Sequence, residues 1–348
     1  MVGALLVIWV IFSITTRGTF LTPRNLSLLV RQMSVTAILA IGMVLVIVAG
    51  QIDLSVGALA GLLGGVAAIS YVNEGVPLGL AFLLALTLGA ILGLLQGLLV
   101  ARLRIPPFIV TLGGMLFFQG ALLGITGGVS RSPASPFLYV GKAYVQKGIG
   151  WGLAVLVTGV LLARLLTAAR GKGTLLGLIA VTWGFTAVLN AYEGIPFPVL
   201  LVLALATIFY VLAAHTPFGR HLYAIGGNRE AAFYSGINIE RHLVAVFTLM
   251  GLMSGVAGVV LTARVGSATS DAGRMMELDA IAAAVIGGTS LLGGQGTVWG
   301  ALLGALVMAS LDNGMSLMNT EAFWQPIIKG SILVVAVGAD MAGRRTEG

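Results

Sequence analysis

A lone aspartate inside a long apolar run is the first residue whose type and position could do chemistry. Asp53 lies in the stretch GMVLVIVAGQIDLSVG, residues 42–57, beside the polar side chains of Gln51 and Ser55. An ionised carboxylate near the centre of a bilayer costs roughly 3 kcal/mol or more unless it faces protein or water. Asp53 therefore predicts a lined pathway or the junction of two short helices.

The glycines on either side of this polar segment favour a helix interruption. Gly50 and Gly57 bracket it, and glycine allows helical hydrogen bonding to stop at membrane depth. A carboxylate in such a break can accept hydrogen bonds from freed backbone N–H groups. We expect Asp53 to cap a helix that begins near Leu54 or Ser55.

A second apolar segment is interrupted in the same way. The stretch AIAAAVIGGTSLLGGQGTVWGALLGALV, residues 280–307, contains repeated glycines and a few polar side chains. Short, interrupted segments at corresponding places in two halves of a chain are typical of transporters. Thr289 and Ser290 could instead cap or bond back to helix carbonyls, and this alternative remains open. The candidate groups that line a transport path are Gln51, Asp53, Ser55, Thr289, Ser290 and Gln295.

The sequence contains no motif that indicates enzymatic or metal chemistry. The chain has no cysteine, and its three histidines all lie between residues 215 and 242. It contains no G-x-x-x-x-G-K-[ST] phosphate loop, no H-E-x-x-H and no G-x-S-x-G. We therefore expect no cofactor, no metal site, no catalytic residue and no ATP site within this chain.

The composition predicts an all-α polytopic membrane protein. Of 348 residues, 58% are hydrophobic and only 9% are charged, and the mean hydropathy is +1.05. A water-soluble fold cannot bury so much apolar surface. The fifty glycines indicate closely packed helices, and the net charge of +7 does not by itself indicate nucleic-acid binding.

The apolar segments predict about twelve crossings within one transmembrane domain, residues 1–348. Residues 33–71 and 278–312 are each expected to form a broken or re-entrant pair. With a cytoplasmic amino terminus, the short basic connections 103–107 and 167–173 and the basic tail fall on the cytoplasmic side. The segments are 2–16, 33–50, 55–71, 78–101, 107–126, 149–166, 173–190, 197–214, 243–263, 278–294, 296–312 and 325–340.

Glycines spaced four residues apart recur in three places. Such spacing lets helix backbones approach closely in lipid. We interpret these glycines as packing residues and give them no part in substrate binding; they are Gly89, Gly93, Gly97, Gly251, Gly255, Gly296, Gly300 and Gly304.

The polar connection 215–242 predicts a short helix held outside the membrane. Asn228 suits the N-cap, Glu230 lies in the first turn, and Gly236 suits a left-handed stop. A capped helix over Arg229–Ser235 would be a docking device, and the alternative is a solvated connector.

Three long motifs resemble the permease subunits of ABC importers of the ribose, xylose and galactose type. Residues 42–57 are similar to that family's GMTxVIxxGGIDLSVG signature, with Gln51 where the family usually has glycine. TPFGRHLYAIGGNREAAFYSGIN and AVIGGTSLLGGQGTVWGALLGAL resemble two further family motifs. The segment FLTPRNLSLLVRQMSVTAIL and the extra spans around 149–190 look most like the D-xylose permease branch.

The resemblance implies a type II ABC importer-like permease that is not itself an enzyme. It would pass a monosaccharide, D-xylose or a related pentose, from an extracytoplasmic binding protein into the cytoplasm. The implied partners are a second copy of the chain and ATPase subunits at the cytoplasmic face of the bacterial inner membrane. The implied ATPase-coupling residues of the loop are Gly226, Gly227, Asn228, Arg229, Glu230, Ala231, Ala232, Gly236 and Asn238.

A proton-coupled secondary sugar carrier is the alternative function. Asp53 and Asp312 could carry protons, and the broken segments suit such a fold. Against it, we count only these two acidic residues at plausible depth, and a stand-alone carrier does not need the capped helix. A structural scaffold without transport activity would leave Asp53 unexplained.

Overall fold

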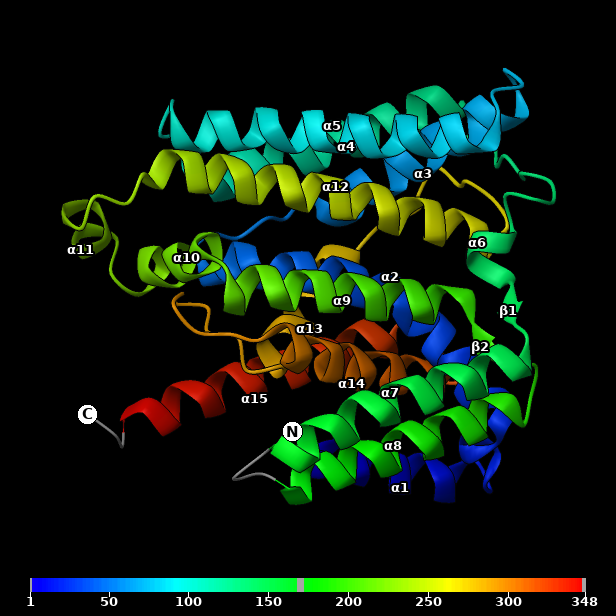
Figure 1. Ribbon diagram of the computed structural model, residues 1–348. Coiled ribbons are helices and arrows are strands. Elements are labelled where there is room, and N and C mark those ends of the chain that lie inside the picture. Colours follow the sequence, from blue (N-terminus) through cyan, green and yellow to red (C-terminus); the bar gives the residue numbers. More distant parts are fainter. Residues whose placement is uncertain (1, 168–171, 346–348) are drawn as a thin grey trace.

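The computed structural model describes residues 2–167 and 172–345 and is a bundle of long, roughly aligned helices (Figure 1). Each of the twelve predicted apolar segments coincides with a helix, which confirms the all-α polytopic fold. These helices are α1 (Val2–Thr15), α2 (Pro23–Val48), α3 (Val56–Val72), α4 (Leu78–Ala101), α5 (Pro107–Thr126), α7 (Lys147–Thr167), α8 (Lys172–Asn190), α9 (Phe197–His215), α12 (Ile239–Val265), α13 (Met276–Ile286), α14 (Val298–Leu317) and α15 (Trp324–Arg345).

Shorter elements connect the long helices. Two strands of two residues each pair antiparallel, with Tyr144 opposite Pro196. The short elements are η1 (Thr19–Leu21), α6 (Tyr139–Lys142), β1 (Tyr144–Val145), β2 (Ile195–Pro196), α10 (Pro217–Gly227) and α11 (Arg229–Tyr234).

The helices differ in whether they can cross a bilayer alone. In the described part of the chain, eight helices are long and apolar enough to do so, while α1, α3 and the start of α15 are shorter apolar helices. The 11 residues of α13 reach only about 16 Å at 1.5 Å per residue. Because the hydrocarbon core is about 30 Å thick, α13 is a half-helix.

Several predicted segment boundaries were wrong, two of them by eight residues or more. Helix α2 begins at Pro23, ten residues before the predicted start at residue 33, because Thr22 caps it and the protein buries its polar first turns. Helix α13 ends at Ile286, although the apolar run was expected to continue to residue 294. Gly288, Gly293 and Gly294 adopt positive φ and turn residues 287–297 into a loop.

The core is built around α2, which lies in the middle of the bundle (Figure 1). Its second half is almost completely buried, and most side chains of α12 and α14 are buried as well. Lipid covers apolar side chains about as well as protein does, so burying them in this core stabilises the fold little. Close packing between the helices must stabilise it instead.

The spaced glycines on helices provide that packing, as predicted, whereas the prediction was wrong for Gly296, which lies in the loop before α14. A Cβ atom at Gly89 or Gly93 of α4 would overlap the backbone of α12 at Gly251 or Phe247. In the same way, a Cβ atom at Gly300 or Gly304 of α14 would overlap the backbone of α13. These helix pairs therefore meet backbone to backbone.

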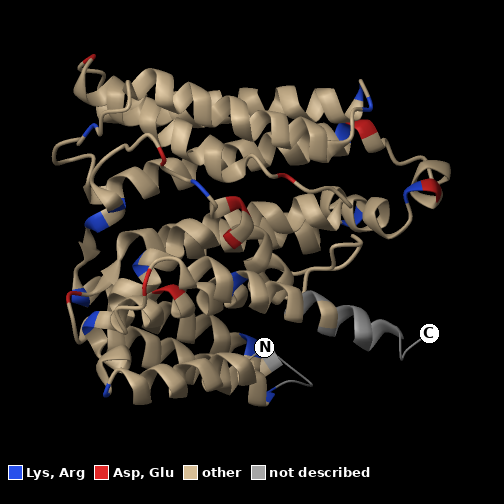
Figure 2. Ribbon diagram, turned by 180° about the vertical axis from the view of Figure 1, so that it is seen from behind, with Lys and Arg blue, Asp and Glu red and all other residues tan. Residues whose placement is uncertain are grey.

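The connections expected on the cytoplasmic side lie at one end of the bundle. The α4–α5 turn, the end of α7, the start of α8 and the C-terminal part of α15 all lie at the end that carries α11 (Figure 1). Of the connection 167–173 and the basic tail, residues 168–171 and 346–348 are outside the described residues. Most charged residues gather at the two ends of the bundle, and a few lie in its middle (Figure 2).

The α7–α8 hairpin lies at the margin of the bundle, where α8 contacts α2 (Figure 1). Most of its side chains are exposed, unlike those of α2 and α14. Its base is tied down by the β1–β2 pair and by Asn190, whose Nδ2 donates to the carbonyl of Lys147 at 3.2 Å.

The α4–α12 contact yields a test of the packing argument. Gly93→Ala should lower the thermal midpoint of the detergent-solubilised protein, because overpacking typically costs about 1–3 kcal/mol. The matched control is Gly120→Ala on α5, where the added methyl meets no atom within 4 Å. Equal midpoints for the two variants would contradict the close α4–α12 contact.

Candidate functional site

The break after α2 is closed by hydrogen bonds of its own backbone. Gly50 has φ 73°, and its N–H donates to the carbonyl of Ile47 at 2.8 Å, while the N–H of Gln51 donates to Val46 at 3.0 Å. This pattern is a Schellman motif, which satisfies carbonyls at a helix end. The amide of Gln51 adds a further bond, because its Nε2 donates to the carbonyl of Gly50 at 2.9 Å.

Asp53 faces protein and is 2% exposed, as expected for a carboxylate at a helix interruption. Its Oδ1 accepts from the backbone N–H of Ser55 at 2.8 Å and from the Ser55 hydroxyl at 2.7 Å. The predicted N-cap geometry was wrong in detail. Helix α3 begins at Val56 with Ser55 as its N-cap residue, so Asp53 forms a turn just before the helix.

The polar group extends to a neighbouring helix through Gln96, a residue that the sequence analysis missed. Its Nε2 donates to the Ser55 hydroxyl oxygen at 2.9 Å, and Gln96 is 5% exposed. Gly114 of α5 gives this amide room, because a Cβ atom there would overlap it. The signal was visible, since Gln96 is the only amide in the apolar run of α4.

The break after α13 uses the same backbone device. Gly288 has φ 88° and donates to the carbonyl of Val285 at 2.8 Å, while the N–H of Thr289 donates to Ala284 at 3.0 Å. A second Schellman motif therefore ends the half-helix. The sequence likeness between the two interrupted segments corresponds to equivalent helix ends.

Residues 289–295 form a compact turn after this helix end. The Ser290 N–H donates to the carbonyl of Gln295 at 3.0 Å, and its hydroxyl oxygen accepts from the Leu292 N–H at 3.2 Å. Thr289 is 2% exposed, and its Oγ1 has no hydrogen-bond partner among the described residues. Ser290 thus supports its turn locally, Thr289 offers a free hydroxyl, and Gln295 is exposed.

The two breaks touch each other, but their polar side chains form separate groups. The Gly294 N–H donates to the carbonyl of Val48 at 2.9 Å and so joins the second break to the end of α2. Asp53 and Ser55 bond to each other and to Gln96, whereas Ser290 bonds within its own loop.

The count of two acidic residues at membrane depth was wrong. Glu277 is 5% exposed against the start of α3, and Asp279 lies in the first turn of α13. Lys329 of α15 pairs with Asp279 at 2.9 Å and with Asp312 of α14 at 2.8 Å. Asp312 and Asp279 therefore share the ammonium group of Lys329, and these ion pairs tie three helices together.

The connection 215–242 forms two short helices in series, of which only α11 was expected. Three side chains cap successive helices: Thr216 accepts from Gly219, Asn228 from Ala231, and Asn238 from Arg241. Helix α10 was missed because its glycines and charges looked like those of a loop. Asn228 and Asn238 thus act as helix caps in the structure.

Helix α11 has the predicted cap and stop. Gly236 has φ 82°; its N–H donates to Phe233 at 3.0 Å, and the Ile237 N–H donates to Ala232 at 3.1 Å. Ala232 is buried, whereas Phe233 and Tyr234 are 65% and 78% exposed. The remaining implied contact residues lie in two groups: Gly227, Arg229, Glu230 and Ala231 are exposed, and Gly226 is partly buried.

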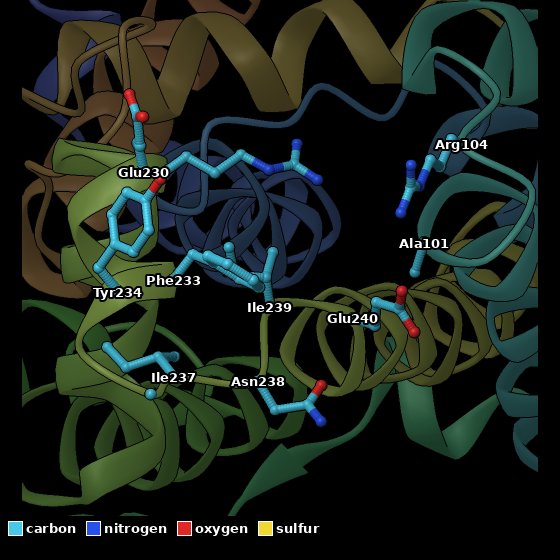
Figure 3. A pocket seen from close by; sticks show the side chains of 11 residues that line it. Ala101, Arg104, Glu230, Phe233, Tyr234, Ile237, Asn238, Ile239 and Glu240 are labelled. Carbon is cyan, nitrogen blue, oxygen red and sulfur yellow. The ribbon is translucent and has the colours of Figure 1, made fainter.

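A groove of about 780 Å³ lies between α11 and the α4–α5 turn. Figure 3 shows Phe233 and Tyr234 on one side of it and Arg104 on the other. Arg104, which the sequence analysis did not single out, adopts φ 56° in the turn. The groove combines aromatic surface with charged groups at the rim, a composition common at protein interfaces.

A helical membrane bundle whose helices are interrupted by two glycine-rich breaks is typical of a transport permease. A family described as the permease component of a branched-chain amino acid transport system matches residues 25–337, and the chain belongs to this family. No solved structure matches the chain.

Several curated relatives of the chain are named as sugar permeases. The chain is 47% identical over 362 residues to the xylose transport system permease protein XylH of Escherichia coli, covering 99% of this chain and 92% of that protein. It is 46% identical over 360 residues to XylH of Haemophilus influenzae, with 99% and 96% covered. Identity to the ribose import permease protein RbsC of Bacillus subtilis is 38% over 322 residues, with 92% and 86% covered.

Substitutions at Asp53 test its part in the first break. Asp53→Asn keeps an acceptor oxygen for the Ser55 N–H, so assembly should be nearly normal with a modest loss of transport. Asp53→Leu leaves the buried N–H of Ser55 unpaired, at about 1–3 kcal/mol, and leaves the Ser55 hydroxyl only the 3.4 Å contact to Gln96 Oε1, so it should lower both the yield and the thermal midpoint. If the leucine variant matches the parent in yield, thermal midpoint and transport, Asp53 does not stabilise the first break.

Proposed function

We propose that this chain is the membrane-spanning permease subunit of an ATP-binding cassette importer for D-xylose or a related pentose. The observation that carries the proposal is the 47% identity to a xylose permease over 99% of the chain. The family description names branched-chain amino acids, but the relatives that cover nearly the whole chain are named for xylose and ribose. The chain is a transport component and not an enzyme.

In this proposal, residues 215–242 are a cytoplasmic coupling loop within a single transmembrane domain, residues 1–348. The exposed Phe233 and Tyr234 on α11 support a docking role, because aromatic side chains at a groove are common anchors in interfaces. Arg229, Glu230 and Ala231 would contact the ATPase directly. Asn228, Gly236 and Asn238 would act through α11, since they set where it begins and ends and where α12 starts.

We further propose that the sugar passes along the two helix breaks. Polar side chains at discontinuous helices are the groups that transporters offer to a substrate. The path would use the Thr289 hydroxyl, which has no hydrogen-bond partner among the described residues, and the exposed side chain of Gln295, while Asp53, Ser55 and Gln51 would hold the first break. Ser290 would shape the second loop.

The partners follow from the importer class. The chain is a multi-pass protein of the bacterial inner membrane, served by ATPase subunits on the cytoplasmic side and by an extracytoplasmic sugar-binding protein. A second copy of the chain, as a homodimer, is part of the proposal and is drawn from the sequence resemblance.

The proton-coupled carrier gains no support. The similar proteins are named as transport system or import permeases. Asp312, one of its two candidate proton carriers, is engaged by Lys329, and Asp53 is engaged by Ser55.

Uptake by reconstituted protein tests the proposed function. Vesicles that contain the permease, its ATPase and its binding protein should accumulate labelled xylose only when ATP is present. Vesicles with the permease alone should not accumulate the sugar, with or without a proton gradient. Gradient-driven uptake by the permease alone would overturn the importer proposal.

The stop of α11 provides a test of the coupling loop. Gly236→Val should reduce the stimulation of ATP hydrolysis by the binding protein, because a β-branched residue in the left-handed region costs roughly 1 kcal/mol or more. No heavy atom lies within 4 Å of the added Cβ, so the strain arises in the backbone alone. Gly236→Asn is the matched control, since asparagine tolerates this region and should retain most of the stimulation. Full stimulation in the valine variant would exclude α11 as the coupling element.

A further inference from the structure

Four glycines from three separate segments meet at the end of α2 and form what we call the glycine junction: Gly50, Gly226, Gly293 and Gly294. A Cβ atom at Gly226 of α10 would overlap the carbonyl oxygen of Val48 and lie 2.7 Å from the nitrogen of Gly294. A Cβ atom at Gly293 would lie 2.8 Å from the carbonyl oxygen of Gly226 and 3.1 Å from the Cα of Gly50. The last turn of α10 is thus wedged against both helix breaks.

Two hydrogen bonds join the segments at this junction. The Gly294 N–H donates to the carbonyl of Val48 at 2.9 Å, which links the second break to the first. The Tyr223 hydroxyl donates to the carbonyl of Gly296 at 2.7 Å, which links α10 to the second break. Burial raises the pKa of Tyr223 above its ordinary value, so the phenol keeps the proton that it donates.

The opposite end of α10 leads directly into α11. Asn228 is the only residue between the two helices; its N–H donates to Ala224 at 3.0 Å, and its side chain accepts from Ala231 at 2.9 Å. Ala232 buries the inner face of α11. Since one doubly bonded residue joins them, a displacement of α11 must carry the end of α10 with it.

We propose that Tyr223 and Gly226 are positioning residues that transmit movement of the docking helix α11 to both helix breaks at once. Packed protein interiors transmit displacement because they have little free volume. The junction gives α10 no room to slide over Val48 or Gly294 without moving them. Movement of α11 would therefore shift the turn before Gln51 and the loop that carries Thr289 and Gln295 together.

This inference rests on the proposed function, and it separates coupling from docking. Neither Tyr223 nor Gly226 lines the groove beside α11. Their loss should leave the ATPase attached and hydrolysing ATP but should weaken the link to sugar movement. A residue that only stabilised the fold would lower attachment, hydrolysis and transport together.

The test compares Tyr223→Phe with Tyr210→Phe in vesicles that contain the permease, the ATPase and the binding protein. Tyr210 lies on α9, and its hydroxyl has no hydrogen bond among the described residues, so Tyr210→Phe makes the same chemical change without the junction. Tyr223→Phe should lower the xylose imported per ATP hydrolysed by about fivefold. A factor of this size corresponds to the net free energy that one hydrogen bond typically contributes. Tyr210→Phe should keep the parent ratio.

Gly226→Ala should lower the ratio further, because its methyl pushes on backbone atoms that cannot rotate away. Ala224→Ser, on the exposed face of the same helix, is its control. A parent-like ratio of xylose to ATP in both Tyr223→Phe and Gly226→Ala would overturn the inference and leave the importer proposal intact. Uptake by the unmodified permease without ATPase would instead overturn both.

A direct measurement of movement is available because the chain has no cysteine. Leu292→Cys introduces a single thiol at a position that is 72% exposed in the second break. Adding the ATPase and ATP should change its rate of labelling by a water-soluble maleimide. The change should be largely lost when Tyr223→Phe is added, and an undiminished change would contradict transmission through Tyr223.

Discussion

The rest of the structure depends on satisfying backbone groups where helices stop inside the membrane. No water in the hydrocarbon core can pair with a freed N–H or C=O group, so each break must supply its own partners. Gly50 and Gly288 do this with left-handed turns, and Gln51 adds its amide to the carbonyl of Gly50. Asp53 accepts the N–H that precedes α3. Gln51 and Asp53 are therefore engaged first in making the first break possible.

The same constraint explains why glycine dominates the close contacts between helices. Where lipid removes the hydrophobic advantage of burying side chains, helices gain stability by bringing their backbones together. The α4–α12 contact at Gly93 and the α13–α14 contact at Gly304 use glycine in this way. At the junction around Gly226, glycine also brings the backbones of three chain segments into contact, and the Gly294 N–H donates to the carbonyl of Val48. Contacts of this kind are short and stiff, which suits parts that move as units.

Much of this arrangement could be predicted from the sequence, and what could not has a physical reason. The helices, the break at Gly50, the cap at Asn228 and the stop at Gly236 follow from local rules, so they were predicted correctly. The start of α2 at Pro23 was missed because the first turns of this helix are polar, and only the folded protein shows that they are buried. The Gln96 contact and the Lys329 ion pairs were missed because they join residues far apart in the chain. Helix α10 was missed because its packing, more than its propensity, makes its glycines helical.

The marginal position of the α7–α8 hairpin has a consequence for how such permeases can diverge. The hairpin is attached through a two-residue strand pair and a few contacts with α2, while both helix breaks and the docking groove lie elsewhere. Because most of its side chains are exposed, the hairpin contributes little to the buried core of the bundle. The hairpin can therefore be gained, shortened or exchanged in evolution without changing the helix breaks. Its exposed surface can also acquire contacts with neighbouring membrane proteins.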